Sequence, residues 1–141
     1  MAMRHTIDEL HARLVQRGWP DMRPAFGYTL VAAQQRQPLT AGALAHLLGF
    51  TKQAASKLID SMEEVGYVRR VSTGGDARMK LVMLTPRGER LLADVEAIYV
   101  EIEAEWAKVI GRKRVEAMRH DLEGVLRSAH GGDLPAVRPT W

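Results

Sequence analysis

A helix predicted from Thr51, its N-cap, to Val65 has one polar side whose first half is basic. Its apolar residues recur at helical spacing and must face a core: Ala55, Leu58, Ile59, Met62 and Val65. The opposite side begins with Lys52, Gln53, Ser56 and Lys57, and its carboxylates come only later. Ammonium, amide and hydroxyl groups are those that contact phosphates and base edges in the major groove of DNA.

Positive charge is concentrated just after this helix. From Gly66 to Arg90 six cations stand against two anions, a local net charge of +4, whereas the whole chain of 141 residues has +3. The six cations are Arg69, Arg70, Arg78, Lys80, Arg87 and Arg90. A solvated helix of mixed charge would explain residues 51–65 alone. The neighbouring cations favour nucleic acid, because they stand where they would neutralise phosphates.

No other constellation of residues indicates catalysis or metal binding. The chain has no cysteine, which excludes disulfides, thiolate zinc sites and cysteine nucleophiles. None of the five histidines stands at the spacing of a helical metal pair with an acidic partner, and no nucleophile–base pair or phosphate-binding glycine loop is found. We therefore expect no enzyme, no cofactor and no metal. Without a long apolar run or a secretory leader, we also expect a cytoplasmic protein with no membrane partner.

Apolar periodicity and capping residues predict the elements that position the basic side chains. Helices are expected over residues 3–16, 22–35, 41–48, 52–65, 86–110 and 113–129. Thr40, Thr51 and Thr85 are expected as N-caps, and Asp21 is expected to cap the second helix. Two β-like runs at 67–71 and 80–84 flank a turn at 73–77 and predict a hairpin. The alternating Glu101, Glu103 and Glu105 indicate solubilising charge on the long helix.

Five segments together resemble the MarR family of bacterial winged helix-turn-helix regulators. Leu39 to Gly49 looks like the family's opening helix, and TKQAASKL (51–58) looks like its recognition helix. MEEVGYVRR (62–70) is similar to the junction between that helix and the wing. DARMK (76–80) matches the family's D-x-R-x-K wing motif, and LTPRG (84–88) its exit into the dimer helix. A helix-turn-helix alone is a weak match, whereas five segments in order at this spacing are specific.

The resemblance implies a fold class that is mainly α with a small β-hairpin wing. Residues 21–86 would form a winged helix-turn-helix DNA-binding domain, and 1–20 and 87–130 would form a helical dimerisation region. The apolar stripes of the first, long and last helices agree with this division, since a lone winged helix cannot cover all three. Residues 131–141, which contain two prolines and little periodicity, are expected to be a flexible tail.

The resemblance also implies a homodimeric, sequence-specific transcription regulator that binds double-stranded DNA. Its operator would be a pseudo-palindrome with half-sites about one helical turn apart. The expected DNA contacts are Thr40, Thr51, Lys52, Gln53, Ser56, Lys57, Arg70, Asp76, Arg78 and Lys80. Among these, the family motif places Arg78 in the minor groove. Asp76 would orient the wing by a salt bridge, or it is a simple turn residue.

Family members often bind small aromatic or phenolic anions between the dimer helices and the DNA-binding part, so a repressor relieved by such a ligand is expected. A crevice could be lined by Trp19, Met22, Arg23, Phe26 and Tyr28, with Tyr99 and Trp106 on the long helix. Arg23 would pair with a carboxylate. Alternatively, the aromatic residues belong to the core and Arg23 is solvated. A different function, a winged-helix protein-interaction scaffold without sequence-specific DNA binding, predicts an apolar or acidic recognition face instead.

Overall fold

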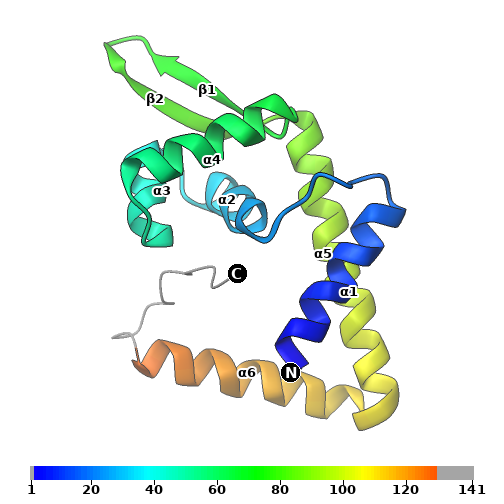
Figure 1. The fold of residues 1–141 in the computed structure, drawn as a ribbon. Helices are drawn as coiled ribbons and strands as arrows, with labels where there is room; N and C mark the ends of the chain where they lie inside the picture. Colours follow the sequence, from blue (N-terminus) through cyan, green and yellow to red (C-terminus); the bar gives the residue numbers. More distant parts are fainter. Residues whose placement is uncertain (1, 130–141) are drawn as a thin grey trace.

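The computed structural model describes residues 2–129, of which residues 2, 3 and 76–78 are described by their backbone alone. Six helices and one hairpin are present in this part of the chain (Figure 1). They are α1 (Ala2–Gln16), α2 (Pro24–Gln35), α3 (Ala41–Leu48), α4 (Lys52–Glu64), β1 (Val68–Thr73), β2 (Asp76–Leu84), α5 (Pro86–Ile110) and α6 (Arg112–Ala129). The flexible tail predicted at 131–141 lies outside the described residues.

Three threonines begin helices as the sequence predicts. The hydroxyl oxygens of Thr40, Thr51 and Thr85 accept hydrogen bonds from the backbone three residues on, at 3.1, 3.1 and 3.0 Å. The expected cap at Asp21 is wrong. Helix α2 begins at Pro24, and its N-cap residue, Arg23, makes no side-chain cap bond. Proline at the first helical position needs no N–H partner, and Met22 before it is drawn into the core, which moves the start past Asp21.

The hairpin is longer than the sequence predicts. Val68 pairs with Leu84 and Ser72 with Lys80, and after a register shift Thr73 pairs with Asp76. The turn therefore contracts from 73–77 to Gly74 and Gly75, a pair that suits a two-residue hairpin loop. The base of β2 is also fixed to the start of α3, because the Val82 N–H donates to the Leu39 carbonyl at 2.7 Å.

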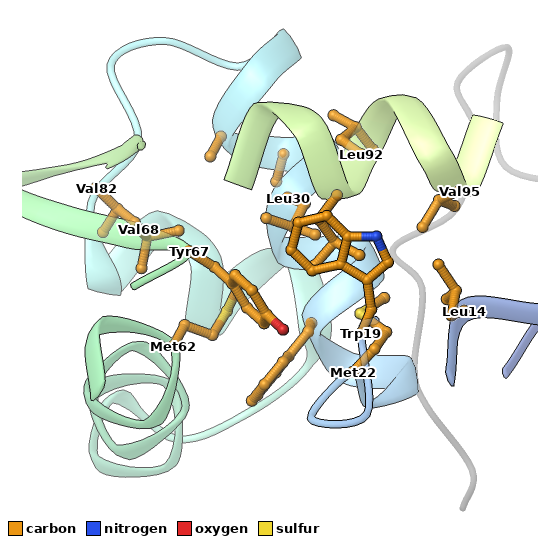
Figure 2. Packing of buried hydrophobic residues seen from close by; sticks show 14 of the residues in the cluster. Leu14, Trp19, Met22, Leu30, Met62, Tyr67, Val68, Val82, Leu92 and Val95 are labelled. Carbon is orange, nitrogen blue, oxygen red and sulfur yellow. The ribbon is translucent and has the colours of Figure 1, made fainter. Parts of the chain in front are cut away.

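Helices α2, α3 and α4, the hairpin and the first turns of α5 form one unit, which we call the head. The hydrophobic core of the head lies between these elements. Figure 2 shows the rings of Tyr67 and Trp19 at its centre. The Tyr67 ring meets Trp19 and Phe26 edge-on, with centroids 6.0 and 6.1 Å away. The guanidinium of Arg87, in the first turn of α5, lies over both Trp19 and Tyr67, at 5.1 and 5.4 Å from their ring centroids. The segment between α1 and α2 is thereby joined to the head.

Helix α5 leads away from the head, with α1 beside it and α6 turning back from its far end (Figure 1). Arg13 of α1 binds both Glu101 and Glu105, which are one helical turn apart and so share a face. Arg17 binds Asp94 at 3.2 Å and Glu101 at 2.5 Å. The interpretation of Glu101 and Glu105 as solubilising charge is therefore wrong, because these carboxylates attach α1 to α5.

Candidate nucleic-acid interface

Helix α4 presents the polar side that the sequence predicts. Its buried residues are Ala55, Ile59 and Met62, while Leu58 and Val65 are half-buried at the edges of that face. Lys52, Gln53 and Lys57 are exposed on the other side, as is the N-cap residue Thr51. Gly49, with φ of +65°, ends α3 in a conformation that favours glycine, and the chain enters α4 within two residues. This is a helix-turn-helix with its basic side outward.

A cleft of about 400 Å³ lies where the starts of α3 and α4 meet the hairpin. It is lined by Thr40, Ala41, Gly42, Lys52, Arg70, Met79, Lys80 and Val82. The fold therefore brings together four residues that the sequence analysis named from four separate segments, namely Thr40, Lys52, Arg70 and Lys80. Lys52 and Lys80 are exposed at this cleft, whereas Arg70 has only 19% of its side chain exposed. Two of its three cations are thus open to solvent.

Arg70 is engaged within the protein. Its side chain forms ion pairs with Asp60, at 2.7 Å, and with Glu63. Its Nη2 donates to the carbonyl and the hydroxyl oxygen of Ser56, at 3.2 and 3.1 Å, and its backbone N–H donates to Glu63 at 2.7 Å. Sequence analysis missed these partners. One feature of the sequence could have indicated them. The chain turns at Gly66, directly after α4, so β1 can run back along the outer side of this helix.

The other DNA contacts expected on the wing are only partly described. Lys80 lies exposed on β2 opposite Ser72. The side chains of Asp76 and Arg78 lie outside the described part of the structure, although their backbone belongs to β2 beside the Gly74–Gly75 turn. The minor-groove role of Arg78 and the orienting role of Asp76 stay predictions.

The residues expected to line a ligand crevice divide into two groups. Trp19, Met22 and Phe26 are buried members of the head core. Arg23 is exposed, with its guanidinium 5.6 Å from the centre of the Phe26 ring, and Tyr28 is half-buried. Burial raises the pKa of the Tyr28 phenol, so this hydroxyl stays protonated and able to donate a hydrogen bond at neutral pH. The packing agrees with the core alternative for three residues, and a ligand site at the five positions stays a prediction.

Among the helices of residues 2–129, none combines the length and the apolar composition that a membrane span requires. The same part of the chain contains no group of three or more His, Asp or Glu residues placed to hold a metal ion.

A sequence model of the MarR family matches residues 28–79, from α2 to the outer part of the wing. Over these residues the chain is similar to the MarR family. This match, together with the likeness to the MepR–DNA complex, supports a DNA-binding transcription regulator and not an enzyme, and the mainly helical fold with a hairpin wing agrees with the family. The fold class and the family resemblance expected from the sequence are therefore confirmed.

Solved structures of MarR-type regulators extend the likeness beyond the matched segment. The DNA complex of MepR from Staphylococcus aureus is 25% identical with a TM-score of 0.67, and the match covers 91% of this chain and 93% of that one. MepR bound to ethidium bromide is 24% identical, with a TM-score of 0.64 and coverage of 92% and 91%. The transcriptional regulator Tm0710 from Thermotoga maritima is 21% identical, with a TM-score of 0.67 and coverage of 94% of both chains.

Proposed function

We propose that this protein is a homodimeric, sequence-specific repressor of the MarR family. The observation that carries the proposal is the basic outer side of α4, which adjoins the cleft lined by Thr40, Lys52 and Lys80. Groups of these types bind phosphates and base edges. The MepR–DNA complex, with a similar fold, supports DNA as the partner. A protein-interaction scaffold would present an apolar or acidic face, which this exposed side is not.

In this proposal each element has its own part in DNA binding. Lys52, Gln53, Ser56 and Lys57 of α4 enter the major groove, where amide and ammonium groups read base edges. Thr40 and Thr51 stand at helix starts, whose free N–H groups attract phosphate. Lys80 and Arg78 of the wing approach the adjacent groove, and Asp76 orients the hairpin. Residues 21–86 then form the DNA-binding domain.

The terminal helices supply the dimer interface in this proposal. Beyond Val115, α6 leaves four large apolar side chains exposed on one face: Met118, Leu122, Val125 and Leu126. Near the end of α5, Val109 is 84% exposed. A contiguous apolar surface on a single chain marks a protein contact. A second copy would cover it through residues 1–20 and 87–130, and it would place two α4 helices on successive half-sites of a pseudo-palindrome.

We propose a small aromatic or phenolic compound as the signal that relieves repression. Arg23, exposed beside Phe26, and the half-buried Tyr28 would offer it a cation and a phenol at the edge of the head core. MepR bound to ethidium bromide supports an aromatic ligand for a protein of this fold. Benzoate is a direct probe, and it should release a fluorescent duplex from the wild-type protein and release less from Arg23→Gln.

The DNA interface is tested by the salt dependence of binding. A duplex is first selected by the wild-type protein from a randomised pool, and its affinity is then measured by fluorescence anisotropy between low and moderate salt. Lys57→Ala should lower the slope of log affinity against log salt by about 0.9, because one phosphate contact is lost. Lys108→Ala, an exposed cation on α5, is the matched control and should leave the slope unchanged. Equal slopes for both variants would exclude α4 from the interface.

A further inference from the structure

We propose that Arg70 is a positioning residue for DNA recognition: it locks the wing strand β1 onto the outer side of α4 and does not itself bind phosphate. The inference rests on the proposed DNA interface and assigns Arg70 a different part in it from the direct contact expected from the sequence. Its role would be to hold Ser56 and the wing in the geometry that reads an operator.

The Arg70 guanidinium has few N–H donors left for DNA. An arginine side chain carries five N–H donors, two on each terminal nitrogen and one on Nε. Nη1 lies against the carboxylates of Asp60 and Glu63, and Nη2 donates to the carbonyl and hydroxyl oxygens of Ser56. Among the residues whose side chains are described, this leaves only Nε–H of Arg70 for another partner. The two parallel bonds by which arginine grips a phosphate are thus not available without breaking these contacts.

The positive charge of Arg70 is compensated by carboxylates of α4. Asp60 and Glu63 are the carboxylates nearest to the basic half of α4, and they would repel a phosphate backbone. Arg70 places one positive charge between them, with little of its own surface exposed. A phosphate would have to displace two carboxylates that are already in contact. Arg70 therefore acts on the electrostatics of the interface by compensating α4.

Ser56 is half-buried on the side of α4 that is proposed to enter the groove. Its hydroxyl oxygen accepts a hydrogen bond from Arg70 at 3.1 Å. A hydroxyl that accepts from one side directs its own hydrogen away from that donor. Arg70 thereby orients the Ser56 hydroxyl as a donor, while the bond from the Arg70 backbone N–H to Glu63 fixes the base of the wing to the same helix.

Glutamate-to-glutamine substitutions separate positioning from phosphate binding by the sign of their effect. Glu63→Gln (E63Q) removes a negative charge beside the DNA, so electrostatics alone predicts tighter binding. If Arg70 positions the wing through Glu63, the affinity for the selected duplex should instead fall about tenfold, the effect of one misplaced base contact. Affinity for a scrambled duplex of the same length should not fall. Glu64→Gln removes the same charge from the exposed neighbouring residue and should weaken neither.

Arg70→Lys gives a second test that does not depend on how well E63Q folds. Lysine keeps the charge but not the fork that reaches Ser56 and the carboxylates together. Positioning predicts a loss of preference for the selected over the scrambled duplex, with an unchanged salt slope on the scrambled one. A general loss of folding would lower both affinities equally, which would contradict a positioning role.

The proposal is overturned if E63Q binds the selected duplex as tightly as Glu64→Gln does, or if Arg70→Lys keeps the full preference. Failure of the DNA interface itself has a different signature, since Lys57→Ala would then leave the salt slope unchanged. A positive result for Lys57→Ala together with a neutral E63Q would keep the interface and reject Arg70 as its positioning residue.

Discussion

Gly88→Ala should destabilise the protein, although alanine is the better helix former. A Cβ atom added at Gly88 would stand 2.0 Å from the carbonyl oxygen of Tyr67 and 3.0 Å from its carbonyl carbon. Both atoms belong to the backbone at the junction of α4 and β1, so no side chain can move aside. Because carbon atoms pack at about 3.5 Å or more, the first turn of α5 must move away from this junction.

The cost can be estimated from the bonds that such a movement breaks. Thr85 donates to the Tyr67 carbonyl through its N–H at 3.1 Å, and its hydroxyl lies 2.5 Å from the Gly66 carbonyl and 3.1 Å from that of Tyr67. The hydroxyl has one hydrogen to donate and shares it between the two carbonyls, so two hydrogen bonds at about 1 kcal/mol each contribute about 2 kcal/mol. Alanine recovers about 1 kcal/mol of helix propensity. The free energy of unfolding should therefore fall by about 1 kcal/mol before any strain is counted, and the strain of the displaced turn adds to this loss.

Urea denaturation followed by circular dichroism at a fixed protein concentration measures this change. Gly124→Ala in α6 is the matched control, because a Cβ there would meet nothing within 4 Å. Gly124 is two residues from Leu122, so it lies on the side of α6 opposite the apolar face. This control should gain about 0.5–1 kcal/mol. A Gly88→Ala protein as stable as the wild type would refute the close contact between α5 and the head.

Two further predictions concern the core and the dimer. Tyr67→Phe should keep or raise the free energy of unfolding, by up to about 1 kcal/mol, because the Tyr67 hydroxyl is buried without a hydrogen-bond partner in the described structure. Burial raises the pKa of Tyr67 above the ordinary 10.0, so the wild type should lose stability as the pH rises above that value, and the variant should lose less; urea midpoints at several pH values measure both. Leu122→Glu should weaken the proposed dimer by about tenfold or more, since the interface would bury an unpaired carboxylate. Sedimentation analysis against Glu123→Gln, its exposed neighbour, would detect the monomer, and a Leu122→Glu dimer of unchanged affinity would place the interface elsewhere.

Helix boundaries could be predicted from the sequence because they depend on local chemistry. Thr40, Thr51 and Thr85 each satisfy an N–H three residues away, and Gly49 supplies the positive φ that ends α3. A residue's own neighbours contain this information. The start of α2 could not be predicted in the same way, because burial of Met22, a tertiary effect, outweighed the capping tendency of Asp21.

Partners distant in the chain explain most of what the sequence left open. Arg13 meets Glu101 and Glu105 across 88 and 92 residues, a distance over which periodicity carries no information. In the sequence, Arg70 is one of several cations of a basic hairpin and nothing distinguishes it. In the structure, β1 runs back along α4 and places Arg70 against Asp60 and Glu63. Local patterns thus identify the surface that is basic, whereas the three-dimensional fold decides which of its cations are already paired.

The net charge of the chain also has to be read together with the pairing of its charged side chains. Helix α5 holds five carboxylates between residues 91 and 109, which suggests an acidic arm that would repel DNA. Four of them pair with arginines of α1 or α6: Asp94, Glu101, Glu103 and Glu105. Lys52 and Lys57 on α4, by contrast, pair with no carboxylate among residues whose side chains are described. The positive electrostatic potential at the proposed DNA interface therefore comes from the unpaired cations of the head. Its strength depends more on which charges form ion pairs within the fold than on the net charge of +3.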